Sequence, residues 1–192
     1  MNAAPRSYCG LSVIKIGGRL STTPGVLDRV CAAVAEASRG RALLVVPGGG
    51  PFADAVRDFD RRVGVSAETA HWMAILAMDQ YAHVLANRIA GAVLVEEPGA
   101  ISKVAGSGRV AVLAPSRWMR SVDVLPHTWD VTSDSIAAFV AGALGAERLV
   151  LIKPTEKGHP VDPYFASALA SGMPFVVLPW DRVEELASLL SE

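Results

Sequence analysis

Apolar residues in this chain fall into short continuous runs separated by longer stretches of helical spacing. The runs at 12–16 and 42–46 are rich in aliphatic residues, and each ends in a glycine turn, so they predict buried strands. Similar runs predict strands at 92–95, 110–113, 149–152 and 175–178. Strands that are apolar on both faces are typical of a parallel sheet covered by helices on each side.

The stretches between these runs predict helices. Apolar residues between Pro24 and Gly40 have helical spacing, and Pro51 opens the next helix. Ser66 has the character of an N-cap for a long helix that ends near Ile89. Further helices are expected at about 133–144, 164–170 and 180–190. Strands that alternate with helices predict one α/β domain over 1–192, a three-layer α/β/α sandwich with a mainly parallel sheet.

The long helix after Ser66 carries more apolar surface than one contact can cover. Its polar residues share a single stripe, formed by Asp79, Gln80, His83 and Asn87. The wide apolar arc on the rest of the helix needs cover on more than one side. We expect the sheet to cover one part and a second copy of the chain to cover another, which predicts a homo-oligomer.

Composition excludes several classes of protein. The 192 residues have a formal net charge of -1, which argues against a nucleic-acid-binding surface. No apolar run reaches the roughly 18 residues of a membrane span, and the start of the chain lacks the apolar segment of a signal peptide. Cys9 and Cys31 have no metal-binding spacing, and we assign no residue as a metal ligand. These features predict a cytoplasmic protein without a membrane partner.

Two glycine turns follow the first two predicted strands. Their sequences are Lys15-Ile16-Gly17-Gly18 and Pro47-Gly48-Gly49-Gly50. Ligands of open α/β sheets bind beyond the carboxyl ends of strands, where glycine lets backbone amides approach an anion closely. Lysine is costly to bury in an apolar strand without a partner, and a phosphate provides one. Ordinary strand-to-helix turns, with Lys15 reaching solvent, remain the alternative, although two such turns in succession favour a phosphate site.

Neither turn matches a familiar nucleotide loop. The pattern Gly-x-x-x-x-Gly-Lys-Ser/Thr is missing from both. Gly48, Gly50 and Ala53 match a relaxed dinucleotide-binding register, but that motif requires a strand after the next helix. Here a second helix follows at once, which argues against a dinucleotide.

A polar segment precedes the predicted helix at 133–144. It contains Trp129, Asp130, Thr132, Ser133 and Asp134. Simple capping of the helix explains one or two of these groups, and their density favours binding of a lysine or a substrate. The sequence leaves two roles undecided. His127 is either structural or functional, and Trp129 is either a core residue or an aromatic wall of the binding pocket.

The order of these motifs resembles the amino acid kinase family, which includes acetylglutamate, aspartate and uridylate kinases. The matching pieces are the two glycine turns, Thr132-Ser133-Asp134, Leu144-Gly145-Ala146 and the strand at 149–152. The sequence from Leu125 to Ala137, together with Lys153, is most similar to one branch of this family. That branch phosphorylates aminomethyl-furanmethanol phosphate in the biosynthesis of methanofuran-type cofactors.

The resemblance implies an ATP- and Mg²⁺-dependent kinase that transfers phosphate to a small phosphorylated acceptor. It implies catalytic roles for Lys15 and Asp134, an acceptor-binding part over about 1–125 and a nucleotide-binding part over about 126–192. The residues it implies for the nucleotide are Lys15, Gly17, Gly18, Lys153, Thr155 and Lys157. The residues it implies for the acceptor are Gly48, Gly49, Gly50, Trp129, Asp130, Thr132 and Ser133.

The chain departs from the family after Lys153. The loop at 153–163 lacks the family's aspartate-glycine pair but keeps Asp162-Pro163, and only about 30 residues follow it. This implies a shortened nucleotide lobe. Two alternatives stay open: a non-catalytic binding or assembly protein on the same fold, and a kinase for another acceptor such as a nucleoside monophosphate or an acidic amino acid.

Overall fold

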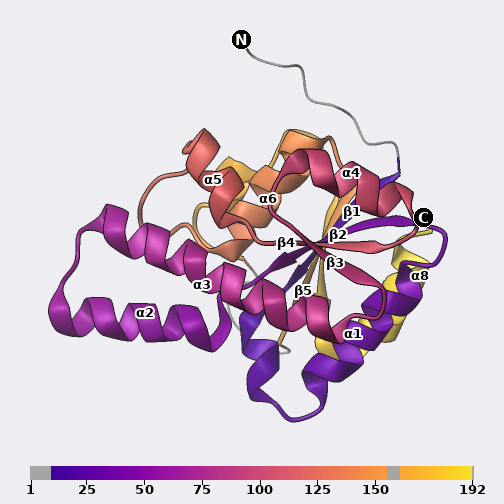
Figure 1. The fold of residues 1–192 in the computed structure, drawn as a ribbon, viewed down its shortest axis with the longest axis horizontal. Coiled ribbons are helices and arrows are strands. Elements are labelled where there is room, and N and C mark those ends of the chain that lie inside the picture. Colours follow the sequence, from indigo (N-terminus) through magenta and orange to yellow (C-terminus); the bar gives the residue numbers. More distant parts are fainter. Residues whose placement is uncertain (1–9, 155–160, 192) are drawn as a thin grey trace.

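A six-stranded sheet forms the centre of the protein. The computed structural model describes residues 10–154 and 161–191. All strand pairs of the sheet are parallel, in the order β3-β4-β2-β1-β5-β6. Figure 1 shows the strands at the centre with helices on either side. The strands are β1 (Leu11–Ile16), β2 (Ala42–Pro47), β3 (Ala92–Val95), β4 (Val110–Leu113), β5 (Arg148–Lys153) and β6 (Phe175–Pro179). Each was predicted from its apolar run, so the parallel α/β class is confirmed.

Helices cover both faces of this sheet. The α-helices are α1 (Val26–Ala37), α2 (Gly50–Val63), α3 (Ala67–Arg88), α4 (Pro98–Gly106), α5 (Ser116–Val122), α6 (Ser133–Leu144), α7 (Phe165–Ala168) and α8 (Leu186–Leu189). On one face, Val13 and Leu44 pack in a core with residues of α4, α5, α6 and α7. On the other, Ile14 and Val45 pack with residues of α1 and α8. The alternation of adjacent strand residues between two cores gives the predicted three layers.

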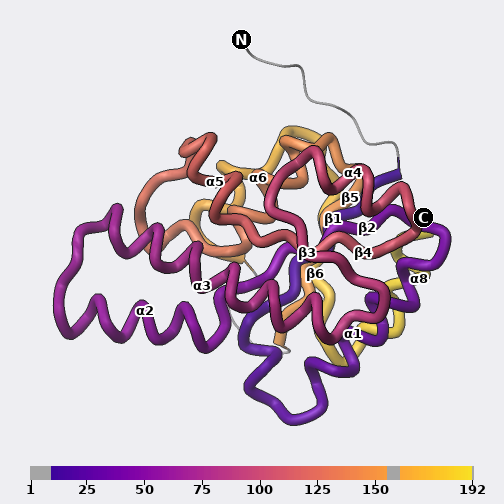
Figure 2. The backbone as a smooth tube through the Cα atoms, in the orientation of Figure 1, coloured from indigo at the N-terminus to yellow at the C-terminus, as the bar shows by residue number. Residues whose placement is uncertain are grey.

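Helix α3 contributes to both cores. Ile75 and Met78 belong to one core, whereas Tyr81 and Leu85 belong to the other. The Ser66 hydroxyl accepts a hydrogen bond from the Thr69 amide at 3.1 Å, which confirms the predicted cap. Helices α2 and α3 form an antiparallel hairpin that projects beyond the sheet, as the backbone trace shows (Figure 2).

Short helices account for the differences from the sequence prediction. Helices α4 and α5 were not predicted, because each has only two or three turns and carries a weak periodic signal. The helix expected at 180–190 is a 3₁₀ segment, η2 (Trp180–Glu185), followed by α8, with a break in helical geometry at Arg182. Within the described ranges, no helix has both the length and the apolar character needed to cross a membrane.

The carboxyl ends of the three central strands lie together. Ile16 at the end of β1 is in register with Pro47 of β2 and Ile152 of β5. The Gly17 amide donates to the Ile152 carbonyl at 2.9 Å, and the Gly48 amide donates to the Ile16 carbonyl at 2.8 Å. Both glycine turns therefore leave the sheet at the same edge, beside the end of β5.

Candidate active site

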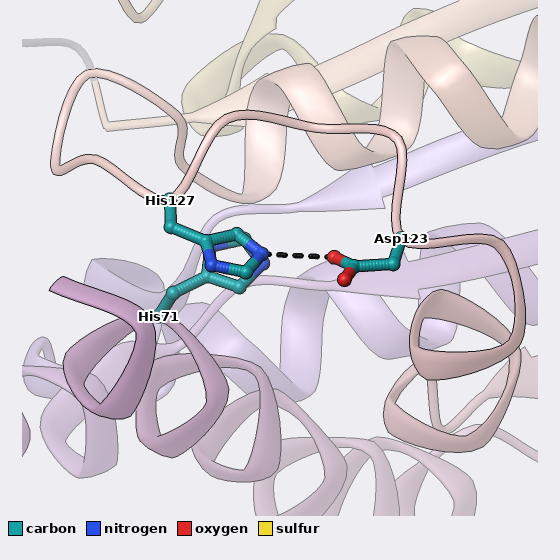
Figure 3. A group of neighbouring side chains, drawn as sticks. All are labelled: His71, Asp123 and His127. Atoms are coloured by element: carbon teal, nitrogen blue, oxygen red, sulfur yellow. Dashed lines mark hydrogen bonds and ion pairs between the residues drawn. The ribbon is translucent and has the colours of Figure 1, made fainter.

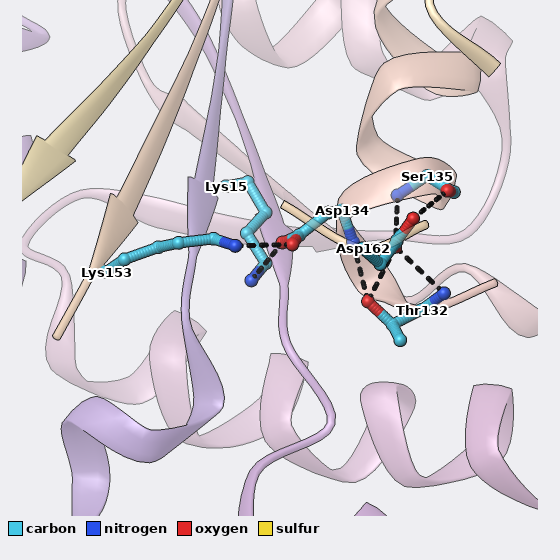
Figure 4. A network of polar contacts seen from close by, with 6 residues as sticks. All are labelled: Lys15, Thr132, Asp134, Ser135, Lys153 and Asp162. Atoms are coloured by element: carbon cyan, nitrogen blue, oxygen red, sulfur yellow. Dashed lines mark hydrogen bonds and ion pairs between the residues drawn. The ribbon is translucent and has the colours of Figure 1, made fainter. Parts of the chain in front are cut away.

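Two lysines and one aspartate form an ion-pair triad at this edge of the sheet. Lys15 Nζ lies 2.7 Å from Asp134 Oδ1, and Lys153 Nζ donates to Asp134 Oδ2 at 2.5 Å (Figure 4). Lys15 comes from β1, Lys153 from the end of β5 and Asp134 from the first turn of α6. Lys15 and Asp134 are only 5% and 4% exposed. The triad has a net charge of +1, suited to an anionic ligand.

The charges of the triad influence the pKa values of Asp134 and Lys153. Burial opposes ionisation of Asp134, but the positive charges of Lys15 and Lys153 outweigh it and lower the pKa of this carboxyl. Burial also lowers the pKa of Lys153, and the neighbouring Lys15 charge adds to the effect, while Asp134 opposes it. A bound anion such as phosphate stabilises the charged form of both ammonium groups by electrostatic attraction.

The two glycine turns pack directly on each other. A Cβ at Gly18 would lie 2.0 Å from the Gly50 nitrogen, and a Cβ at Gly48 would lie 2.4 Å from the Gly18 nitrogen. Gly50 also has a φ of +57°, a left-handed conformation that glycine adopts without strain. Glycine is thus required here for close contact between the two backbone turns, a demand that the sequence pattern alone did not reveal.

The amides of these turns differ in availability. The Gly17 and Gly48 amides donate to carbonyls of the sheet, so the predicted contact of the Gly17 amide with a phosphoryl group is not supported by its hydrogen bonding. Among the described residues, the Gly18 and Gly49 amides show no such backbone partner. Gly18, Gly49 and Gly50 all line the cavity described below. They are the glycines placed to present N–H groups to an anion.

Asp162 ties the loop after β5 to the start of α6. Its carboxylate accepts hydrogen bonds from the amide and hydroxyl of Thr132, at 2.9 and 2.7 Å. It also accepts from the amide and hydroxyl of Ser135, at 3.0 and 2.5 Å (Figure 4). The N-cap of α6 is Thr132, whose hydroxyl accepts a long hydrogen bond from the Asp134 amide at 3.4 Å. Asp162 thereby fixes the helical turn that carries Asp134.

These elements enclose a cavity of about 630 Å³. Its lining combines the triad with the glycine turns, the N-terminal half of α3 and the segment before α6. Arg19 and Arg57 add guanidinium groups to the lining, and Val177 and Pro179 of β6 add apolar surface. A cavity of this size and mixed character is typical of a small-molecule site.

Trp129 forms one wall of the cavity. Its indole Nε1 donates to Asp60 Oδ2 at 2.9 Å, and the Arg57 guanidinium lies 4.6 Å from the centre of its ring. The Trp129 hydrogen bond and then the Val65 amide lower the pKa of Asp60. Helix α2 holds the ring at the cavity wall and Trp129 belongs to neither core, so it is not a core residue, and its stacking against a ligand stays a prediction.

The structure brings together most of the residues singled out from the sequence. The predicted residues that line the cavity are Lys15, Gly17, Gly18, Gly49, Gly50, Trp129, Thr132, Ser133, Asp134 and Lys153. Gly48 and the exposed Asp130 do not belong to the lining. Thr155 and Lys157 lie outside the described residues.

Sequence reasoning missed several residues of the site. They are Arg19, Asp54, Arg57, His71 and Asp162. The Asp162-Pro163 pair was noted in the sequence, but Asp162 and Thr132 are far apart along the chain, so their contact was not predicted. His71 is one of two histidines in the long helix α3, and nothing in the sequence distinguished it as a site residue.

Comparisons with known proteins agree with this architecture. A curated relative, [5-(aminomethyl)furan-3-yl]methyl phosphate kinase of Methanocaldococcus jannaschii, is 27% identical over 141 residues, which cover 73% of this chain. The match spans 64% of the length of that relative. Two solved structures share the fold. UMP kinase from Ureaplasma parvum aligns with a TM-score of 0.68 and 14% identity, over 97% of this chain and 96% of that one.

The second structure, uridylate kinase from Archaeoglobus fulgidus, aligns with a TM-score of 0.59 and 18% identity, over 77% of this chain and 64% of that one. At these identities the structural matches establish the fold alone. The sequence model of the amino acid kinase family matches residues 10–156, well over half of the chain and including the whole triad. The resemblance drawn from the glycine turns and Thr132-Ser133-Asp134 is thus confirmed, and the chain belongs to the amino acid kinase family.

Proposed function

We propose that this protein is an ATP-dependent kinase that phosphorylates a small alcohol phosphate to a diphosphate. The observation that carries the proposal is the buried Lys15–Asp134–Lys153 triad, open to a cavity of about 630 Å³. Phosphoryl transfer depends mainly on positioning and on stabilising the charge that spreads over the transferred group. A triad with two cations and one anion meets that requirement.

The residues of the site fit the phosphates of a nucleotide. Lys15 and Lys153 would hold the transferring group, assisted by the Gly18 amide, and Asp134 would keep both ammonium groups aimed at it. When bound, ATP with Mg²⁺ supplies the phosphoryl group and a metal ion that shields the charge of its phosphates. Gly17 would shape the first turn through its hydrogen bond to the Ile152 carbonyl.

An acceptor that is itself a phosphate suits the other side of the cavity. A phosphate monoester is largely ionised at neutral pH, so its oxygen attacks without a dedicated general base. Its negative charge needs neutralisation, which Arg57 and the amides of Gly49 and Gly50 would provide. Thr132 and Ser133 add hydroxyl groups near the triad.

Among phosphorylated acceptors, [5-(aminomethyl)furan-3-yl]methyl phosphate is the one we propose. The named kinase of Methanocaldococcus jannaschii acts on this compound and shares 27% identity with the chain. The Arg57 guanidinium covers one face of the Trp129 ring, and the furan ring would stack against the other face. The exposed Asp130 would then act at the entrance to the cavity rather than against the bound ring.

We further propose a homo-oligomer built through the α2–α3 hairpin. Helix α2 has no buried residue in the monomer, and Phe52, Phe59 and Val63 are exposed along one of its stripes. Leu76 of α3 is also 45% exposed. Large apolar side chains gathered on a projecting hairpin are typical of a protein interface.

A panel of acceptors tests the assignment. Purified protein with ATP and Mg²⁺ is given the furan phosphate, UMP, AMP or an acidic amino acid, and ADP formation is followed. We expect turnover on the furan phosphate to exceed that on the other acceptors by at least about 100-fold, as unsatisfied polar groups in a specific site penalise wrong substrates. A preference for UMP would contradict the assignment of the furan phosphate as the acceptor. Calorimetry that shows no nucleotide binding would instead favour a non-catalytic protein.

A further inference from the structure

Two histidines and an aspartate cluster at the rim of the cavity, away from the lysine triad. His71 lies in the first turns of α3, Asp123 caps the end of α5, and His127 lies in the segment before α6 (Figure 3). Their side-chain ligand atoms all lie within 4.8 Å of one another. Phosphoryl transfer as proposed above gives this cluster no role.

The imidazole rings are stacked and present their nitrogens toward Asp123 (Figure 3). Their centroids are 4.2 Å apart with an interplanar angle of 21°. His127 Nε2 is hydrogen-bonded to Asp123 Oδ1 at 2.8 Å, whereas no hydrogen bond to the His71 ring is found in the part of the chain that the structure describes. A half-buried imidazole with an uncommitted nitrogen has a lone pair available for a ligand.

His71 and His127 also contact the same tryptophan. Each imidazole makes a T-shaped contact with the Trp72 ring, and the Arg120 guanidinium lies 4.5 Å from the centre of that ring.

A small space is present beside these groups. A second cavity of about 10 Å³ is lined by His71 and Asp123 together with apolar residues of α3 and α5. Tetrahedral zinc, with bonds of about 2.0–2.1 Å, requires ligand atoms about 3.4 Å apart. Closing from 4.8 Å needs movements of about 1.4 Å at most, which rotation of the exposed Asp123 side chain and of His127 supplies.

We propose that His71, Asp123 and His127 form a binding site for a divalent transition metal of the zinc class. Two imidazoles and one carboxylate are a ligand set for zinc and related ions, and they leave at least one coordination position for water or another ligand. Since His71 and His127 also line the main cavity, the metal joins α3 to the segment before α6 at the cavity rim. The cluster shares no residue with the lysine triad.

Metal titration of untagged, chelator-treated protein tests the proposal. Zn²⁺ is followed by calorimetry, and Co²⁺ is followed by the visible absorption that a tetrahedral site gives. We expect one saturable equivalent in the wild type, with affinity at least about 10-fold weaker in His71→Gln, His127→Gln and Asp123→Asn. The control is His83→Gln, because His83 is an exposed histidine of the same helix and its loss should leave affinity unchanged.

Asp123→Asn protects the test against misfolding. Asp123 has a φ of 40°, and asparagine tolerates this left-handed conformation, so the variant removes the charge without straining the backbone. Circular dichroism verifies that each variant is folded. Absence of a saturable equivalent in the wild type overturns the proposal, and so does wild-type affinity in both Asp123→Asn and His127→Gln.

Discussion

Asp134 keeps two lysine ammonium groups side by side in a place with little access to water. Its carboxylate contacts Lys15 and Lys153 through different oxygens, so one anion partly neutralises two cations. Removing one partner of a buried ion pair leaves charge without compensation and is strongly destabilising. The Asp134 carboxylate therefore contributes both to the stability of the fold and to the positions of the two ammonium groups in the site.

Asp134→Asn should therefore lower both stability and activity. The amide keeps the shape of the side chain but leaves two neighbouring lysines without a counter-charge. We expect a loss of about 3 kcal/mol in the free energy of unfolding, measured by urea denaturation. Asp58→Asn on the exposed face of α2 serves as the control and should change stability by less than about 0.5 kcal/mol. Equal stability of Asp134→Asn and wild type would contradict the account.

The stability that Asp134 contributes should depend on pH. The pKa of Asp134 is lowered in the folded protein from its ordinary value of 3.8. Its stabilising effect is complete above that value and is lost as the pH falls through the lower folded-state pKa. The difference in stability between wild type and Asp134→Asn should thus shrink as the pH is brought below 3.8, followed by urea midpoints across the acid range.

At the scale of elements, the strand ends and helix starts carry the site. The turns after β1 and β2 contact each other through Gly18, Gly48 and Gly50, and this contact sets the spacing between η1 (Gly18–Thr22) and α2. Asp162 sets the position of α6 in a similar way, from a loop more than 25 residues further along the chain. Each tie joins segments that are distant in sequence.

Gly18→Ala should separate the two turns. The added Cβ would lie 2.0 Å from the Gly50 nitrogen, which forces the backbone apart. We expect a loss of stability of at least about 3 kcal/mol, or failure to fold, because neither backbone is free to move aside. Gly99→Ala is the matched control: its Cβ meets nothing within 4 Å, and in α4 alanine should be neutral or stabilising by up to about 1 kcal/mol.

Asp162→Asn tests the tie at α6. Asparagine can accept hydrogen bonds through only one oxygen, so part of the four-bond contact with Thr132 and Ser135 is lost. We expect a loss of about 1–3 kcal/mol in unfolding free energy and a lower kcat through misplacement of Asp134. The same Asp58→Asn variant is the control. A variant with normal kcat and normal stability would show that the tie is dispensable.

The elements themselves were largely readable from the sequence. The six apolar runs predicted the strands because buried parallel strands are apolar on both faces, and Ser66 predicted the start of α3. The short helices α4 and α5 were not predicted, because a helix of few turns gives little hydrophobic periodicity. The mutual contact of the glycine turns was not predicted either, because sequence spacing does not report distances between loops.

At the scale of the whole molecule, the cavity is assembled from both halves of the chain. Lys15 and the glycine turns come from the first third, whereas Asp134 and Lys153 come from the last. Sequence spacing alone did not show that these residues meet; the resemblance to the amino acid kinases implied it. His71 was unpredictable for a related reason, as its partners Asp123 and His127 lie more than 50 residues away along the chain.

The projecting α2–α3 hairpin predicts self-association. Phe52, Phe59 and Val63 are exposed along α2, and burying them against a second copy would remove this apolar surface from water. Size-exclusion chromatography with light scattering should give a mass of at least twice the monomer's 20.2 kDa. Phe59→Glu should yield monomer, whereas Val124→Glu, at an exposed apolar residue outside the hairpin, should not. A monomeric wild type would contradict this prediction.

If Lys15 acts on the transferred phosphoryl group, the Lys15→Met variant should lose most of its activity. Methionine keeps most of the apolar stem, with one heavy atom fewer, and removes the ammonium group. With ATP, Mg²⁺ and [5-(aminomethyl)furan-3-yl]methyl phosphate, we expect kcat for ADP formation to fall by at least about 100-fold, because a preorganised charge contact at the transition state is lost. The exposed Lys103→Met should keep wild-type kcat. A folded Lys15→Met protein with near-normal kcat would show that Lys15 does not act on the transferred phosphoryl group.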